Sequence, residues 1–313
     1  MNEKYPLVSI VMPSFNTANF IEEAILSVLN QDYPNVELII IDGGSTDGSI
    51  EIIKKHSSRL GYWISESDKG AVDAINKGLA KCNGEYIGIL LSDDCYYLDS
   101  ISRNVRLLNS KPEIDFVFGD TEQVDKQGNR LFLRMGNNLP FQQWVRTCTM
   151  PIAIHASVWR RSLLGRIGTF RISMGVATDW DFFLRVGLTS KIEYLPGLGG
   201  KFRYYSGTQS EKKQLDWVTL VPQMYKDLFT HPLITKELLK IKNESMSCAN
   251  MYSAELLIEA SLFKSAFKKL MLAFWTYPKV CISSRFIKLT IKLLLGKQSK
   301  HASNFVKNIL GEK

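Results

Sequence analysis

The first hundred residues alternate between short apolar runs and longer segments in which apolar residues recur every three or four positions. Continuous apolar runs predict buried strands, and the spaced apolar residues predict amphipathic helices. We predict strands at Val8–Met12, Val36–Ile41, Tyr62–Ile64 and Tyr86–Leu91, with a helix between each pair. Strands that alternate with helices of roughly 10 to 15 residues form βαβ units, so the sheet should be mostly parallel.

Beyond residue 97 the hydrophobic pattern is less regular. We expect a strand at Asp115–Asp120, a hairpin turn at Lys126–Arg130 and a helix that begins near Thr178. From Leu215 onward the apolar period is helical. The sequence therefore predicts an α/β catalytic domain at residues 1–210, with halves at 1–97 and 98–210, and a helical, basic extension at 211–313.

Three successive strands of the first half end in polar loops that carry aspartates. Asp42 ends the second strand, Asp68 follows the third, and Asp93 and Asp94 follow the fourth. The carboxyl ends of parallel strands share one edge, where ligands of open α/β sheets bind. Paired carboxylates suit Mg²⁺ or Mn²⁺ held together with substrate phosphates, whereas a turn or helix cap before Ser100 is the alternative. Neither a dinucleotide-binding GxGxxG nor a Walker A loop is present.

The net charge of +8 is confined to the C-terminal part of the chain. Residues 261–313 contain eleven Lys and Arg and one acid, so the rest of the chain gives no reason to expect nucleic-acid binding. The segment Cys281–Leu295 interleaves basic and apolar residues, a pattern typical of helices on anionic membrane surfaces. A helix packed on the catalytic domain with a solvated Lys face is the alternative.

Cysteine usage and hydropathy bear on location. The five cysteines form no CxxC pair, which favours reduced thiols in the cytoplasm. The N-terminal residues show no signal-peptide pattern, and no apolar run reaches the roughly 18 residues of a membrane span. We expect a cytoplasmic protein, peripheral on the inner face of the cell membrane.

Five motifs occur in the order and spacing of a known family. They are Val8–Asn16, Ser27–Gln31, Ile41–Gly48, Asp68–Gly70 with Asn76–Gly78, and Leu91–Asp94. From about residue 7 to 205 the chain resembles glycosyltransferase family 2, and within it the bacterial exopolysaccharide and O-antigen (colanic-acid-type) branch. The resemblance implies a GT-A fold, with a Rossmann-like central sheet flanked by helices.

The resemblance also implies roles for individual residues. The nucleotide-binding positions are Pro13, Phe15, Asn16, Asp42, Asp68, Lys69 and Asp93; the metal ligands are Asp93 and Asp94; the general base is Asp179; and two further candidates are His155 and Asp181. The implied enzyme is an inverting hexosyl- or N-acetylhexosaminyltransferase that uses Mn²⁺ or Mg²⁺. Its donor would be a nucleotide sugar, with a UDP-sugar favoured, and its acceptor a glycan or lipid-linked saccharide.

Two positions depart from the family pattern. Gly43 stands where many relatives carry a second acid, which leaves uridine selectivity open, and Leu91 stands where the first acid of a DxD motif belongs. The chain shows no evident Ser/His/Asp or Cys/His arrangement, which agrees with a single displacement that needs no protein nucleophile. An alternative function remains: a binding module of the same fold that docks on membrane, nucleic acid or a partner through its basic tail, without transferase activity.

Overall fold

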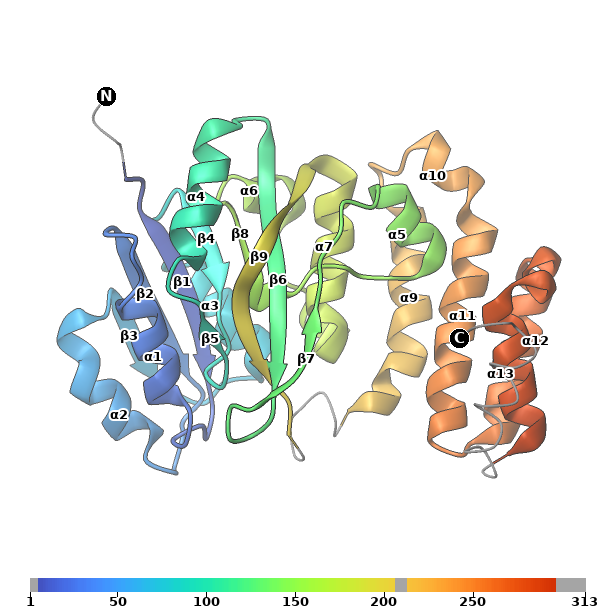
Figure 1. Ribbon diagram of the computed structural model, residues 1–313, viewed down its shortest axis with the longest axis horizontal. Helices are drawn as coiled ribbons and strands as arrows, with labels where there is room; N and C mark the ends of the chain where they lie inside the picture. The colour runs from blue at the N-terminus through green and yellow to red at the C-terminus, as the bar shows by residue number, and fades with distance from the viewer. Residues whose placement is uncertain (1–4, 206–212, 297–313) are drawn as a thin grey trace. The chain divides into compact units, whose positions relative to one another are not determined.

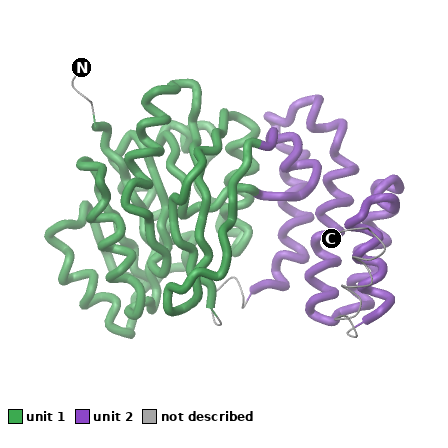
Figure 2. The backbone as a smooth tube through the Cα atoms, in the orientation of Figure 1, with its two compact units in different colours: residues 1–138, 151–208 green, residues 139–150, 209–313 purple. Residues whose placement is uncertain are grey.

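The computed structural model describes residues 5–205 and 213–296 of the chain. The chain divides into two compact units: unit 1 comprises residues 1–138 and 151–208, and unit 2 comprises residues 139–150 and 209–313 (Figure 2). The segment 139–150 thus groups with the C-terminal helices. The catalytic boundary that the sequence predicts at residue 210, and its division at residue 97, stay predictions.

Unit 1 contains a single mixed sheet with helices on both faces (Figure 1). Its strands among the described residues are β1 (Val8–Ser14), β2 (Val36–Asp42), β3 (Tyr62–Ser65), β4 (Tyr86–Ile89), β5 (Cys95–Tyr96), β6 (Ile114–Val124), β7 (Arg130–Arg134), β8 (Ser157–Arg160) and β9 (Lys191–Arg203). The strand order is β3-β2-β1-β4-β8-β6-β9-β5, and β7 pairs with β6. Strands β1 to β4 are mutually parallel, as the βαβ pattern predicts.

The helices of unit 1 connect the strands. They are α1 (Ile21–Leu29), α2 (Ser49–His56), α3 (Ala71–Leu79), α4 (Ser100–Ser110), α6 (Leu163–Ile167) and α7 (Thr178–Thr189), with short 3₁₀ turns η1 (Ser57–Arg59), η2 (Ile154–Ala156) and η3 (Ile172–Ala177). Successive β1 side chains point to opposite faces of the sheet. Ile10 and Met12 share a buried core with Ile25 of α1, whereas Val11 packs beneath Gly78 of α3. Both faces of β1 are therefore dry, which explains its continuous apolar sequence.

The second half of the sheet is mixed. Strand β8 is antiparallel to β4 and β6, β9 runs parallel to β6, and β5 is antiparallel to β9. The predicted hairpin is confirmed, because β6 and β7 pair on either side of a turn in which Gly128 donates to the Asp125 carbonyl. Strand β6 extends beyond the predicted Asp120 to Val124.

Unit 2 is helical. Its helices are α5 (Phe141–Thr147), α9 (Trp217–Thr230), α10 (Lys236–Lys240), α11 (Lys242–Glu259), α12 (Phe263–Thr276) and α13 (Ser284–Leu295), with 3₁₀ turns η4 (Gln214–Asp216) and η5 (Pro278–Ile282). A core of its own joins Met251 of α11, Leu270 of α12 and Phe286 of α13. In the part of the chain that the structure describes, no helix combines the length and hydropathy of a membrane span.

Candidate active site

The loops after β1, β2 and β4 are tied together at one edge of the sheet. The Ser14 hydroxyl donates to Asp42 Oδ1 at 3.1 Å, which joins the ends of β1 and β2. The Thr17 hydroxyl donates to Ser92 Oγ at 3.0 Å, which joins the β1 loop to the loop that carries the aspartate pair. Ligands of open α/β sheets bind outside the carboxyl ends of the strands, and this is that edge.

The residues predicted to lie beside a nucleotide begin with the loop after β1. Pro13 is buried inside β1, paired with Ile41, whereas the Phe15 side chain is 58% exposed. Asn16 adopts a left-handed backbone (φ 53°), donates its N–H to Ser45 Oγ at 2.8 Å and accepts from Thr46 N–H at 2.8 Å. Asn16 thus joins two strand-end loops, and Phe15 presents an open ring.

Asp42 is completely enclosed by protein donors. Its side chain is buried, and Oδ1 accepts from the Ser14 and Ser45 hydroxyls at 3.1 and 2.5 Å. Oδ2 accepts from the Gly44 and Ser45 N–H groups at 3.1 and 2.9 Å and from the Ser65 hydroxyl at 2.7 Å. Five donors satisfy the lone pairs of a carboxylate. In this structure Asp42 organises the ends of β1, β2 and β3.

The carboxylate of Asp68 lies over Gly43, the residue after Asp42, which has no side chain. Asp68 Oδ1 accepts from Gly70 N–H at 2.7 Å, and a Cβ built on Gly43 would stand 2.8 Å from Asp68 Oδ2. The loop after β3 therefore places an acid where the loop after β2 has no side chain. Lys69 is exposed, and its backbone N–H donates to Asp73 at 3.2 Å.

Asp93 and Asp94 are held by residues at the end of β9. The Tyr205 hydroxyl donates to Asp93 Oδ2 at 3.3 Å, and Arg203 Nε donates to the Asp93 carbonyl at 3.0 Å. The Arg203 backbone N–H donates to Asp94 Oδ1 at 2.9 Å. Asp93 is partly buried and Asp94 is fully buried. The two carboxylates therefore have different environments.

Arg203 also reaches two other segments, the start of α1 and the turn after β6. It lies 4.9 Å from the Phe20 ring and donates to Glu23 Oε2 at 2.8 Å and to the Lys126 carbonyl at 3.0 Å. Its side chain is buried, and its planar fork of donors suits several oxygens at once. No sequence motif predicts this role, because Arg203 meets its partners only in the folded chain.

Asp94 faces a second buried titratable group. Within the described residues Asp94 Oδ2 has no hydrogen-bond partner, and it lies 3.7 Å from His155 Nδ1. Burial raises the pKa of Asp94 well above its usual value, and the neighbouring Asp93 charge raises it further. Burial lowers the pKa of His155 to about 3, so its imidazole is neutral at pH 7. The ring stacks on Phe202 with centroids 5.3 Å apart.

A divalent cation fits this aspartate pair. No group of three or more His, Cys, Asp or Glu that could hold a metal occurs within residues 5–205 and 213–296. Mg²⁺ and similar ions, however, are usually held by one or two carboxylates together with substrate phosphates. The unpaired, buried Asp94 Oδ2 and the partly exposed Asp93 are hard oxygen donors of that kind. The donor set fits the ion, and the metal role of these residues stays a prediction.

Asp179 lies in the first turn of α7. Its Oδ1 accepts from Trp180 N–H at 2.7 Å. Burial raises the pKa of Asp179, and the nearby Arg134 charge lowers it. The same Arg134 charge lowers the pKa of His155. The Arg134 charge therefore acts on both residues.

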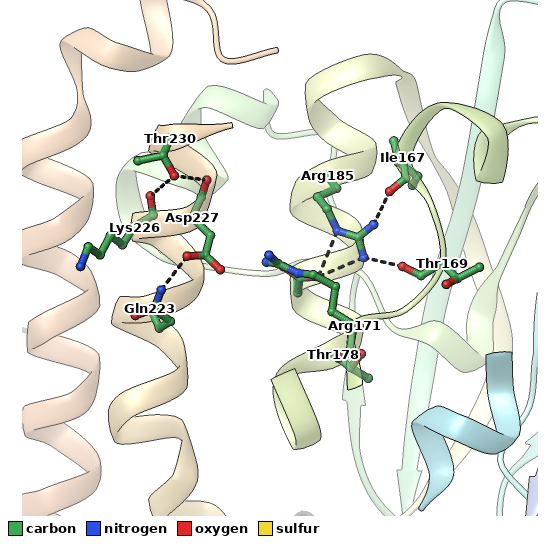
Figure 3. Close-up of polar contacts among 10 residues, drawn as sticks. Ile167, Thr169, Arg171, Thr178, Arg185, Gln223, Lys226, Asp227 and Thr230 are labelled. Atoms are coloured by element: carbon green, nitrogen blue, oxygen red, sulfur yellow. Dashed lines mark hydrogen bonds and ion pairs between the residues drawn. The ribbon is translucent and has the colours of Figure 1, made fainter. Parts of the chain in front are cut away.

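Asp181 faces away from this group and pairs with two arginines. Arg171 forms an ion pair with it, and Arg185 Nε donates to Asp181 Oδ2 at 3.0 Å. Arg185 also donates to the Ile167 and Thr169 carbonyls at 2.5 and 3.0 Å (Figure 3). These contacts give Asp181 a structural position that joins α6 and α7.

The structure therefore brings most of the predicted residues to one edge of the sheet. Hydrogen bonds and close contacts link the segments that carry Asn16, Asp42, Asp68 and Asp94. Asp181 alone is committed to a separate ion-pair network. The binding and catalytic roles of all these residues stay predictions.

Comparison with known proteins identifies the class. Residues 9–171 match the model of the family "Glycosyl transferase family 2". The uncharacterized glycosyltransferase RC0461 of Rickettsia conorii is 29% identical over 222 residues, which is 68% of this chain and 36% of RC0461. The chondroitin synthase of Escherichia coli is 27% identical over 217 residues, 68% of this chain and 31% of that protein. The matches thus span about a third of the length of these relatives.

Solved structures show the same fold. The S. aureus TarS fragment 1-349 has a TM-score of 0.67 at 16% identity and covers 98% of this chain and 92% of its own. The mannosyltransferase PcManGT of Pyrobaculum calidifontis, in complex with GDP-Man and Mn²⁺, has a TM-score of 0.61 at 17% identity, with 99% and 89% covered. The predicted GT-A fold with a helical C-terminal region is confirmed. The chain belongs to glycosyl transferase family 2.

Proposed function

We propose that this protein is an inverting glycosyltransferase that moves a hexosyl or N-acetylhexosaminyl group from a UDP-sugar to a glycan or lipid-linked saccharide. The observation that carries the proposal is the convergence of the loops that carry Asp42, Asp68 and the Asp93–Asp94 pair at one edge of the sheet. The likeness to chondroitin synthase supports a role in bacterial surface polysaccharide synthesis, such as an exopolysaccharide or O-antigen.

Asp68 supports uridine as the base of the donor. Its Oδ1 accepts from Gly70 N–H, and its Oδ2 lies over Gly43, where it could accept the N–H on the pairing edge of uracil. The exposed ring of Phe15 provides a surface on which a base can stack. TarS forms complexes with UDP-GlcNAc and with UDP, which supports the same donor class.

The aspartate pair would stabilise the leaving group through a bound divalent cation. Asp93 and Asp94 would hold Mn²⁺ or Mg²⁺, which supplies Lewis-acid stabilisation of the departing diphosphate. Arg203 and Tyr205 orient Asp93, and the neutral His155 borders Asp94 without adding charge. Lys69 is an exposed cation on the nucleotide side of this edge.

Asp179 would take the proton of the acceptor hydroxyl as that oxygen attacks the anomeric carbon. A base whose pKa is raised by burial holds a proton more readily than an exposed aspartate. Attack opposite the leaving diphosphate inverts the anomeric centre in one displacement. No covalent glycosyl-enzyme is required.

The experiment is a panel of nucleotide sugars assayed for release of nucleoside diphosphate with Mn²⁺ or Mg²⁺. We expect release from a UDP-sugar that depends on the cation and is abolished in Asp93→Ala, with Asp216→Asn on the exposed η4 turn as the matched control. Full activity of Asp93→Ala would contradict the metal assignment. Absence of release with every donor, in a protein that still binds membranes, would favour the binding-module alternative.

We further propose that the protein works at the inner face of the cell membrane, where a lipid-linked acceptor would be presented. The support is the basic composition of residues 261–313.

A further inference from the structure

Helix α12 carries an outer face that combines basic and large apolar side chains. Its buried side consists of Ala266, Leu270 and Ala273, which pack in the core of unit 2. The opposite side is formed by Lys264, Phe267, Lys268, Leu272 and Trp275, all of them exposed. Residues three and four positions apart share a helix face, so these five side chains form one continuous surface, called here the α12 outer face.

The apolar side chains of the α12 outer face are exposed to solvent. Phe267 is 53% exposed, Leu272 50% and Trp275 75%, and Ile282 in the following turn η5 is 81% exposed. Trp275 is held in place by an edge-to-face contact with Phe274, with ring centroids 5.5 Å apart. Single exposed apolar residues need no explanation, but a contiguous group marks an interaction surface.

The charge around this surface has one sign. Residues 261–296 contain seven Lys and Arg and not one Asp or Glu. Lys264 and Lys268 lie on the α12 outer face itself, and Lys279 is exposed in η5. Such a surface attracts an anionic partner and repels another basic one.

The segment Cys281–Leu295, which the sequence predicts to lie on a membrane, contributes to the core of unit 2. In α13, within the predicted range Cys281–Leu295, Phe286 and Leu289 are buried against α11 and α12. The side of α13 that carries Phe286 and Leu289 therefore stabilises unit 2, whereas Leu294 and Leu295 at its end are exposed. The outward combination of aromatic, aliphatic and basic side chains lies on α12.

We propose that the α12 outer face docks unit 2 on an anionic lipid bilayer, with Trp275 and Leu272 inserted at the interface and Lys264 and Lys268 at the headgroups. This inference rests on the membrane location proposed above. A basic face with apolar residues between its charges is the pattern of helices that lie in a membrane interface. Tryptophan prefers this depth because its ring is apolar and its N–H is polar.

Other occupants fit the α12 outer face less well. A second copy that used the same face would bring like charges together, which disfavours a symmetric dimer. Nucleic acid would satisfy the lysines but would leave Leu272 and Ile282 without apolar partners.

The test is flotation of the full-length protein with vesicles of equal parts phosphatidylglycerol and phosphatidylcholine, compared with vesicles of phosphatidylcholine alone. Donor and cation are omitted, so the result does not depend on transferase activity. We expect binding to the anionic vesicles only. Trp275→Ala should weaken the partition coefficient about tenfold, and the double variant Lys264→Glu/Lys268→Glu on the order of 100-fold.

Leu239→Ala and Lys240→Glu are the matched controls, because both side chains are exposed on α10 of the same unit. They should bind like the wild type, and all variants should keep its thermal midpoint. Vesicle binding that survives both α12 variants would overturn the α12 assignment while leaving a membrane location intact. Equal binding to neutral vesicles, no binding at all, or a dimer that dissociates in Trp275→Ala would also overturn it. Release of nucleoside diphosphate, assayed separately, decides the transferase proposal.

Discussion

The carboxylate of Asp68 occupies the space that a side chain at Gly43 would need. A Cβ on Gly43 would lie 2.8 Å from Asp68 Oδ2, closer than real Cβ atoms approach a neighbour, and 3.1 Å from Asp68 Cγ. The two positions are therefore coupled, because a side chain at Gly43 would have to shift the Asp68 carboxylate. Gly43 departs from the family pattern, and Asp68 fills the resulting space.

Gly43→Ala should weaken donor binding because the new methyl group displaces the Asp68 carboxylate. We expect the KM for the UDP-sugar to rise about tenfold with little change in kcat, the result of losing one hydrogen bond to a charged group. In an Asp68→Ala background the same substitution should add little, because residues in contact are not additive. Calorimetric titration of the four proteins measures the coupling. Gly165→Ala is the control, since a Cβ there meets nothing within 4 Å, and fully additive effects would contradict the coupling.

Asp179→Asn should lower kcat by roughly 10² to 10⁴-fold, the usual contribution of a general base. Because the base must be ionised, the wild-type rate should fall as the pH drops through the raised pKa of Asp179. That acidic limb should disappear in Asp179→Asn, while the affinity for the donor stays near the wild-type value. A variant that kept the acidic limb would show that another group titrates in the reaction.

Asp94→Asn should stabilise the protein near neutral pH while removing cation-dependent activity. The pKa of Asp94 is raised in the folded state, so the folded protein holds this proton more tightly than the unfolded chain. Stability is therefore lost as the pH rises from the unfolded pKa, near 3.8, through the folded pKa. Each unit of difference corresponds to about 1.4 kcal/mol.

Thermal unfolding across pH checks this linkage. The gain in Tm of Asp94→Asn over the wild type should be largest at pH 7 and should shrink as the pH falls toward the unfolded pKa near 3.8, below which both states are protonated. Adding Mn²⁺ should raise the Tm of the wild type and not that of the variant. A variant less stable than the wild type at pH 7 would show that ionised Asp94 is a net stabilising group.

The strand ends were predictable from sequence because one local rule governs them. A buried apolar run followed by an aspartate marks both the strand and its carboxyl edge, and this rule located Asp42, Asp93 and Asp94. This rule does not predict that Asp42 accepts five hydrogen bonds from the protein itself, because the donors come from three separate strand ends.

The second half of the sheet was harder to predict because its strands break the usual composition rules. Strand β9 contains Pro196 and several glycines, which resemble turn residues in sequence. Gly200 is required there because a Cβ would lie 2.2 Å from the His155 carbonyl. The close approach of β9 to η2 is a property of the assembled sheet, and it also places Arg203 beside Asp94.

Arg203→Lys should both destabilise the protein and weaken its response to the cation. Lysine can replace the charge near Glu23 but not the forked donation that also reaches the carbonyls of Asp93 and Lys126. We expect a loss of about 2 to 4 kcal/mol in the free energy of unfolding, because buried acceptors are left unpaired. Arg106→Lys, on the exposed side of α4, is the matched control and should change neither property.

The Mn²⁺ dependence of Arg203→Lys distinguishes a role of Arg203 in positioning Asp93 from a purely structural role. If Arg203 holds Asp93 in place, the Mn²⁺ concentration that gives half-maximal activity should rise severalfold at a temperature where the variant is fully folded. Its kcat at saturating Mn²⁺ should recover toward the wild-type value, because the cation can reorder a displaced carboxylate when it is supplied in excess. A variant that is less stable but has an unchanged Mn²⁺ dependence would restrict Arg203 to the packing of β9 against α1.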